Sequence, residues 1–192
     1  MELVFATNNQ HKLTEIKNLL NKQFIVRSLE DIGCREEIPE EQSTLEGNAL
    51  QKAQFVYSHY GLNCFADDTG LEVEALGGHP GVFSARYAGQ GKNSDDNIRK
   101  LLDKLSEIKN RNARFRTVIA LVIDGKEILF EGIAEGTILY QKKGENGFGY
   151  DPVFCPNGST CSFAEMDMET KNKISHRGFA FEKLVHFLNC ER

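Results

Sequence analysis

Apolar residues at the start of the chain change their spacing after residue 6. Leu3 to Ala6 is a continuous apolar run, which predicts a buried strand, and the polar Thr7-Asn8-Asn9 ends it. From Lys12 onward apolar residues recur at helical intervals, which predicts an amphipathic helix whose buried face is formed by Leu13, Ile16, Leu19 and Leu20.

A strand, a polar turn and a helix in this order place backbone N–H groups and the positive end of the helix dipole where an anion binds. Thr7, Asn8 and Asn9 add side-chain donors, and Lys12 has the length to reach a phosphate. The alternative is that Asn8-Asn9 is only a helix cap or a turn. No glycine-rich P-loop is present here.

A second strand is predicted over Phe24 to Leu29, and residues 30–42 form an acidic, irregular stretch that includes Glu40. By default each glutamate in such a run is a solvated loop residue. Ser43 and Glu46 have the spacing of a capping box, which predicts the start of a long helix. Its inner face would contain Leu45, Ala49, Ala53, Val56, Tyr57 and Tyr60. Lys52 lies off that stripe and is by default a surface lysine.

The apolar run Leu62 to Ala66 predicts a strand that leads to two adjacent carboxylates, Asp67 and Asp68, and we expect Thr69-Gly70 to turn the chain away. A strand that ends in acids places hard oxygen ligands at the edge of an α/β sheet. Two neighbouring carboxylates repel each other unless a cation or a raised pKa relieves them. The alternative is a solvated turn.

Later segments complete an α/β pattern. A helix starts at Ser94 or Asp95, a β-hairpin runs over residues 115–130 with Asp124-Gly125 as a type I′ turn, and residues 132–139 extend its second arm. This order predicts a mixed central β-sheet flanked by helices. Since no repeat, linker or composition shift is visible, residues 1–192 are expected to form one domain.

Two further segments carry candidate chemistry. Residues 144–152 alternate glycines with Phe148 and Tyr150, so that backbone approaches a flat ligand while an aromatic ring stacks on it, and Asp151 is placed to accept hydrogen bonds from a base or ribose. An aromatic-anchored surface loop is the equal alternative. Residues 171–178 gather Lys171, Lys173, His176 and Arg177 around Ser175, the expected N-cap of a terminal helix, which favours an anion.

Composition narrows the class of partner and compartment. The net charge of −5 and pI of about 5.6 argue against a protein that coats a nucleic-acid polymer. Five cysteines without Cys-x-x-Cys spacing indicate neither a disulfide framework nor a zinc site. The longest apolar run, Val118 to Ile123, is too short to span a membrane, and no signal peptide is visible at the N-terminus. We therefore expect a cytoplasmic protein.

An acidic metal site, cationic anion-binding turns and an aromatic loop together describe a magnesium-dependent enzyme that acts on a nucleotide. Five segments, in order and over nearly the whole chain, are similar to the signatures of the inosine-triphosphate pyrophosphatase family. They are Thr7-Asn8-Asn9 through Lys12, Ala66-Asp67-Asp68-Thr69-Gly70-Leu71, Leu76-Gly77-Gly78-x-Pro80-Gly81-Val82-Phe83-Ser84-Ala85-Arg86-Tyr87, Gly147-Phe148-Gly149-Tyr150-Asp151-Pro152 and Lys171-x-x-x-Ser175-His176-Arg177.

This resemblance implies hydrolysis of deaminated purine nucleoside triphosphates (ITP, dITP and XTP) to monophosphate and pyrophosphate, with Mg²⁺ as cofactor. It also implies a cytoplasmic homodimer and two lobes that hold the active site in a central cleft. By resemblance Asp68 is the general base, and Glu40, Asp67 and Asp68 lie at the metal. The implied substrate-binding residues are Thr7, Asn8, Asn9, Gln10, His11, Lys12, Lys52, Thr69 and Arg86 for the triphosphate, and Phe148, Gly149, Tyr150, Asp151, Lys171, His176 and Arg177 for the sugar and base.

One departure concerns the acidic loop, where Glu41-Gln42 stands in place of the Thr and Gly that usually follow the metal glutamate in bacterial members. Glu40 is preferred over Glu41 because it follows Pro39 and precedes Lys52 by twelve residues, as in the family pattern. Two other functions remain open. One is a nucleotide-binding regulatory module without chemistry, and the other is a pyrophosphatase for other altered nucleotides, such as pyrimidines.

Overall fold

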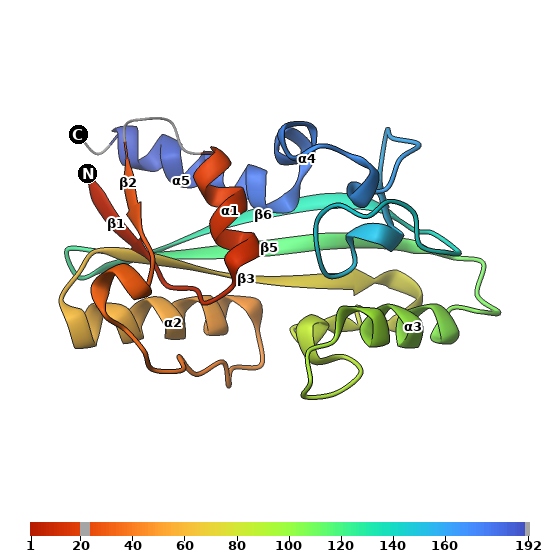
Figure 1. The fold of residues 1–192 in the computed structure, drawn as a ribbon, viewed down its shortest axis with the longest axis horizontal. Coiled ribbons are helices and arrows are strands. Elements are labelled where there is room, and N and C mark those ends of the chain that lie inside the picture. The colour runs from red at the N-terminus through yellow and green to blue at the C-terminus, as the bar shows by residue number, and fades with distance from the viewer. Residues whose placement is uncertain (20–23, 191–192) are drawn as a thin grey trace. The chain divides into compact units, whose positions relative to one another are not determined.

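A computed structural model describes residues 1–19 and 24–190 (Figure 1). The strands are β1 (Glu2–Phe5), β2 (Ile25–Arg27), β3 (Cys64–Val73), β4 (Pro80–Gly81), β5 (Asn112–Ile123), β6 (Lys126–Ile138) and β7 (Phe154–Pro156). The α-helices are α1 (Gln10–Leu19), α2 (Leu45–Tyr60), α3 (Ser94–Lys104), α4 (Met168–Ile174) and α5 (His176–Cys190). Short 3₁₀ turns are η1 (Glu30–Ile32), η2 (Glu74–Leu76), η3 (Ser84–Arg86), η4 (Asp151–Val153) and η5 (Phe163–Glu165).

The strands of the described residues form one mixed sheet in the order β2-β1-β3-β5-β6-β7, with β4 paired to β3. β1 lies parallel to both β2 and β3, whereas the pairs β3–β4 and β6–β7 are antiparallel. The predicted mixed α/β class is confirmed. In the same residues, no helix has the length and apolar character needed to cross a membrane.

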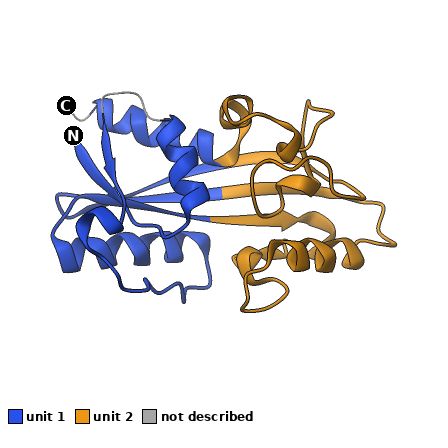
Figure 2. Ribbon diagram, viewed as in Figure 1, with its two compact units in different colours: residues 1–68, 117–132, 177–192 blue, residues 69–116, 133–176 orange. Residues whose placement is uncertain are grey.

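The chain divides into two compact units (Figure 2). Unit 1 contains residues 1–68, 117–132 and 177–192, and unit 2 contains residues 69–116 and 133–176. The long strands β3, β5 and β6 contribute residues to both units. That residues 1–192 act as one domain stays a prediction.

Unit 1 has α1 and α5 on one side of its strands and α2 on the other (Figure 1). Leu3 and Phe5 of β1 pack with Leu13 and Ile16 of α1 and with Phe181 of α5. Because side chains alternate along a strand, Val4 between them is buried apart from this cluster. The predicted apolar face of α1 is therefore confirmed at Leu13 and Ile16, and its last member, Leu20, lies outside the described residues.

The core of unit 2 is built on aromatic rings. Phe115 of β5 meets Phe154 of β7 edge-on, with 4.7 Å between ring centroids, and Phe163 packs on both. Ile98 and Leu101 of α3 close this core. Tyr150 is a buried member of the same cluster.

The predicted hairpin is confirmed. Asp124 and Gly125 have φ of 49° and 76°, and positive φ at both positions is the requirement of a type I′ turn. The turn predicted at Thr69-Gly70 is wrong, because β3 continues through both residues to Val73. Gly70 is needed instead for close approach of β4, since a Cβ there would lie 2.7 Å from the carbonyl oxygen of Gly81.

The start of α2 also differs from the prediction by one residue. Thr44, rather than Ser43, is the N-cap, and its side chain accepts a hydrogen bond from Gly47 N at 3.0 Å. Capping at Thr44 makes Gly47 the third helical residue, so Glu46 does not complete a capping box.

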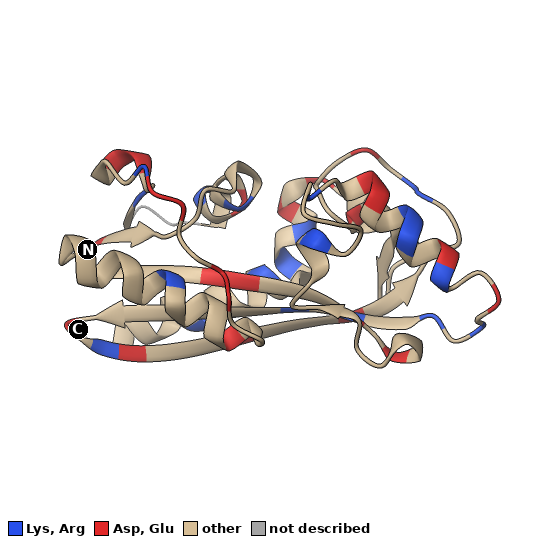
Figure 3. Cartoon of the chain, turned by 90° about the horizontal axis from the view of Figure 1, so that it is seen from below, with Lys and Arg blue, Asp and Glu red and all other residues tan. Residues whose placement is uncertain are grey.

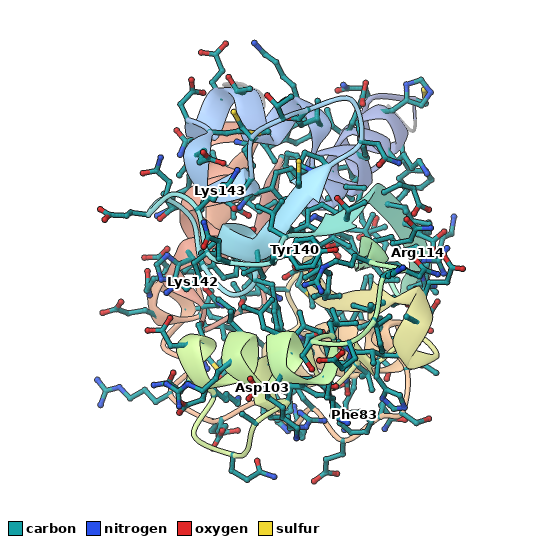
Figure 4. The ribbon with its side chains drawn as sticks, turned by 90° about the vertical axis from the view of Figure 1, so that its right-hand side faces the viewer. Phe83, Asp103, Arg114, Tyr140, Lys142 and Lys143 are labelled. Carbon is teal, nitrogen blue, oxygen red and sulfur yellow. The ribbon has the colours of Figure 1, made fainter. Side chains whose placement is uncertain are left out.

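The segment after β6 presents Tyr140, Lys142 and Lys143 on the surface of unit 2 (Figure 4). Beneath Tyr140 lies the buried Arg111, whose guanidinium carbon is 4.3 Å from the tyrosine ring centroid. Arg111 donates to three backbone carbonyls, those of Leu105 (3.1 Å), Ile138 (2.6 Å) and Leu139 (2.8 Å). This cation therefore holds the end of β6 and also contacts the ring of the exposed Tyr140.

Candidate active site

Asp67 is the most buried of the predicted site carboxylates, with 1% of its side chain exposed. Lys12 Nζ lies 3.0 Å from Asp67 Oδ1, and Arg177 donates to Oδ2 through Nε (3.1 Å) and Nη2 (3.0 Å). Burial opposes the charged form, but the attraction of Lys12, Arg177 and Lys52 outweighs it and holds the pKa of Asp67 far below its usual range. Asp67 is thus a permanent anion inside unit 1.

Asp68, the next residue, has a different environment. Its Oδ2 accepts a hydrogen bond from Asn48 Nδ2 at 3.0 Å, and its Oδ1 is 4.0 Å from Lys52 Nζ. Burial raises the pKa of Asp68, and the nearby lysines and Asn48 offset this only in part. Two adjacent carboxylates therefore have pKa values pushed in opposite directions, which is the arrangement expected when one group carries fixed charge and the other accepts a proton.

Lys52 lies between Asp68 and Glu40 of the acidic loop that precedes α2. Figure 3 shows this loop, with its Asp and Glu residues in red, passing over α2. Lys52 Nζ donates to Glu40 Oε1 at 2.6 Å. The prediction of a surface lysine is wrong, because the loop covers this side of α2 and buries Lys52. Burial lowers its pKa, but Asp68, Glu40 and Asp67 raise it more, so Lys52 stays protonated. Glu41 is exposed and uses its backbone N–H to bind Gln51, which favours Glu40 as the site glutamate.

The turn before α1, residues 7–9, caps the N-terminus of this helix. Asn9 Oδ1 accepts hydrogen bonds from His11 N (3.0 Å) and Lys12 N (3.2 Å), and Asn9 N donates to Thr7 Oγ1 at 3.2 Å. This is the alternative that the sequence left open for Asn9. Asn8, Gln10 and His11 are exposed. Lys12 is drawn inward by Asp67, and burial lowers the pKa of its ammonium group.

The site carboxylates fit a magnesium ion that is coordinated mainly by water and substrate. Within residues 1–19 and 24–190, no three His, Cys, Asp or Glu side chains are grouped to enclose a metal. Mg²⁺ commonly uses one or two carboxylates and completes its shell with water and substrate phosphates. Glu40 and Asp68, which both reach the same ammonium group, supply such a pair of hard oxygen donors. Asp67 suits this role less, because Lys12 and Arg177 already hold its oxygens.

Unit 2 contains a second buried charge pair. Lys171 Nζ lies 2.6 Å from Asp151 Oδ2, and the same oxygen accepts a hydrogen bond from Phe148 N at 2.9 Å. The Lys171 ammonium is 5.3 Å from the Phe148 ring centroid. Asp151 therefore holds the glycine-rich loop and Lys171 together. A role of these residues and of Gly149 toward sugar or base stays a prediction.

Other predicted binding residues have partners of their own in unit 2. Tyr150 is buried and donates its hydroxyl to Ser84 O at 3.0 Å, whereas Phe148 is only half-buried. The His176 ring is stacked on Phe115, with centroids 4.5 Å apart. Arg86 lies over the Phe83 ring at 5.4 Å, and Thr69 is a half-buried residue of β3.

The family resemblance places Arg177 near the sugar and base, but its guanidinium is bonded to other protein side chains. Nε and Nη2 bind Asp67 and Nη1 binds Glu15, so the guanidinium is committed to carboxylates of unit 1 in this structure. Sequence reasoning missed both Glu15 and Asn48. Glu15 precedes the apolar Ile16 on a polar helix face and gives no local signal. Asn48, like Lys52 one turn further along, lies off the apolar stripe predicted for α2, so its burial gave no local signal either.

Comparison with known proteins adds a further observation. A model of the Ham1 family matches residues 3–187. The chain is similar to a dITP/XTP pyrophosphatase of Porphyromonas gingivalis, at 58% identity over 100% of this chain and 99% of that protein. It is 53% identical to a dITP/XTP pyrophosphatase of Flavobacterium johnsoniae, with 100% of both chains covered. The solved structure of the Staphylococcus aureus Ham1 protein matches with a TM-score of 0.90 at 39% identity, over 100% of both chains.

Proposed function

The chain belongs to the Ham1 family, and on this premise we propose that it hydrolyses deaminated purine nucleoside triphosphates (dITP, XTP and ITP) to the nucleoside monophosphate and pyrophosphate. The observation that carries the proposal is full-length identity of 53% and 58% to proteins named dITP/XTP pyrophosphatase. The family resemblance seen in the sequence is confirmed by these matches.

In the proposed reaction a water molecule attacks the α-phosphorus, the bond to the bridging oxygen breaks, and pyrophosphate leaves. Asp68 takes the proton of the attacking water. Its raised pKa supports this assignment, because a carboxylate with a pKa nearer to neutrality is a better general base. Asn48 holds one oxygen of Asp68, which fixes the direction of the other.

The cations of unit 1 would position the triphosphate. The Lys12 and Lys52 side chains are donors next to the proposed catalytic carboxylates, and phosphate oxygens would compete with Asp67 and Glu40 for them. Arg86 and residues 7–11 at the start of α1 complete the set of residues proposed to hold the triphosphate. Glu40 and Asp68 would hold Mg²⁺, which would neutralise charge on the phosphates when bound.

Selection of a deaminated purine requires hydrogen-bond donors that face the keto oxygen at C6. An amino group in the same place leaves donors on both sides unpaired. Backbone N–H groups or His176 would supply these donors. Arg177 supplies one only if it leaves Asp67, since its three nitrogens all donate to Asp67 or Glu15. A homodimer, a cleft between two lobes and a cytoplasmic location are further parts of the proposal.

A pyrophosphate-release panel tests the proposal. The purified chain is assayed on dITP, XTP, ITP, GTP, ATP and TTP, with and without Mg²⁺. We expect release from the first three substrates, with little from GTP, ATP or TTP, and none without the metal. Nucleotide binding without release would indicate a regulatory module, and a preference for TTP would indicate a pyrophosphatase for altered pyrimidines.

A further inference from the structure

Three consecutive residues of the acidic loop are each bound by a different side chain of α2. The bonds are Lys52 Nζ to Glu40 Oε1 (2.6 Å), Glu41 N to Gln51 Oε1 (3.1 Å) and Gln42 N to Asn48 Oδ1 (2.9 Å). The end of the loop next to α2 is thus held at three consecutive residues by one face of the helix. Among these side chains, Asn48 also contacts Asp68.

Each end of the Asn48 side-chain amide makes one hydrogen bond, and the two bonds together determine the orientation of the amide. Oδ1 accepts from Gln42 N, which is only a donor, and Nδ2 donates to Asp68, whose ionised carboxylate is only an acceptor. A reversed amide would place like groups against each other at both ends. Asn48 is 1% exposed, so water does not replace either bond.

Gly47 gives independent support for this arrangement. A glycine in the first turn of a helix costs about 1 kcal/mol relative to alanine. Its φ is not positive, so a left-handed conformation does not explain it. A Cβ at position 47 would lie 2.7 Å from Gln42 Cβ. The glycine therefore makes room for the loop to lie against α2 directly beside Asn48.

We propose that Asn48 is a positioning residue that ties the acidic loop to Asp68 and so fixes Glu40 and Asp68 relative to each other. This inference rests on the proposed function, in which both carboxylates act on one triphosphate. Glu40 keeps more exposed surface than Lys52 or Asp68, so the loop needs this attachment to hold its carboxylate in place. Because both ends of the buried Asn48 amide are already bonded within the protein, Asn48 would contact neither the phosphates nor the reacting water.

Two substitutions at this position separate its two bonds. Asn48→Ala removes both. Asn48→Asp keeps an acceptor for Gln42 N but loses the donor to Asp68 and places a second carboxylate next to it. The matched control is Gln54→Ala, which removes an exposed amide from the same helix and its bond to Glu127. Gly47→Ala moves the loop while improving the helix propensity of α2.

Two measurements are made on each variant at a temperature where it is folded. Backbone hydrogen exchange reports protection of the Gln42 amide, and steady-state kinetics with dITP report kcat and KM separately. We expect Asn48→Ala to lose Gln42 protection and about 10- to 100-fold in kcat, the usual effect of losing a group that orients a metal-binding carboxylate. KM should change less than about threefold, because Asn48 makes no contact with substrate.

The other variants complete the test. Asn48→Asp should keep Gln42 protected and lose a similar factor in kcat, Gly47→Ala should lower both readouts, and Gln54→Ala should change neither. An Asn48→Ala enzyme with wild-type kcat, or with an unchanged Gln42 amide, overturns the inference. If wild-type protein does not hydrolyse dITP, the proposed function fails, while hydrogen exchange still shows whether Asn48 holds the loop.

Discussion

Arg177 donates two hydrogen bonds to one oxygen of Asp67, from Nε at 3.1 Å and from Nη2 at 3.0 Å. Both side chains are almost fully buried. A buried pair of this kind is weak evidence for net stability, but removal of one partner is costly because the other charge is left without compensation. The pair also joins the N-terminus of α5 to β3 at the position before the proposed base.

We expect Arg177→Met to lower the free energy of unfolding by about 3 to 5 kcal/mol, since Asp67 and Glu15 both lose their guanidinium partner. Urea denaturation measures this. The control is Arg99→Met, which removes an exposed pair with Asp96 and should cost less than about 1 kcal/mol. Equal effects of the two substitutions would show that the buried pair has no special role.

Asp68→Asn should lower kcat for dITP by about 100- to 10,000-fold, the range for loss of a general base. The fold should persist, because burial already disfavours the charged form of Asp68. Pyrophosphate release and thermal melting are measured together. Asp124→Asn in the hairpin turn is the control and should leave both unchanged, since Asn suits positive φ as well as Asp does. Turnover near the wild-type rate would reject Asp68 as the base.

Removal of divalent metal should separate activity from stability. The buried carboxylate Asp67 is compensated by Lys12 and Arg177, and Glu40 and Asp68 by Lys52, so the fold needs no metal for charge balance. Excess EDTA should therefore abolish dITP hydrolysis and shift Tm by less than about 1 °C, as expected when a ligand does not bind tightly to the substrate-free protein. A drop of several degrees would identify a structural metal instead.

The buried phenol of Tyr150 should make the stability of the fold depend on pH in the alkaline range. Burial raises the pKa of its phenol, and the hydroxyl donates to Ser84 O. The folded-state pKa exceeds the unfolded value of about 10, so this contribution to stability is complete below about pH 10 and is lost as pH rises toward the folded-state pKa. Tyr150→Phe should cost about 1 kcal/mol at neutral pH, and the difference from wild type should shrink at higher pH. Denaturation at several pH values measures this, with exposed Tyr140→Phe as the control.

Gly147→Ala should disrupt the Asp151–Lys171 pair. Gly147 has a φ of +74°, and a Cβ there would meet Asp151 Oδ2 at 2.1 Å. Gly149 also has positive φ, +61°, but a Cβ there meets nothing within 4 Å. Gly149→Ala should therefore cost about 1 kcal/mol of strain, whereas Gly147→Ala should cost more than about 2 kcal/mol because a buried charge pair is also displaced. Similar melting temperatures for the two variants would contradict this difference.

Local pattern was sufficient for much of the fold. The period of Leu13 and Ile16 predicted α1, and Asp124-Gly125 predicted the hairpin, because helix faces and two-residue turns depend on residues close in sequence. The adjacent acids Asp67 and Asp68 and their likeness to a family signature also came from sequence alone. Where a local rule failed, as at Thr69-Gly70, the cause was a distant partner, the backbone of Gly81.

Tertiary structure alone decided which charges meet. Nothing in the helical pattern of α2 shows that Lys52 is buried, because the loop that covers it lies outside the helix. Likewise the opposite pKa directions of Asp67 and Asp68 depend on Lys12, 55 residues from Asp67, and on Arg177, 110 residues from Asp67. Electrostatic interactions act through space and desolvation, so the sequence by itself identifies the ionisable groups, whereas folding decides their partners and which of them can accept a proton.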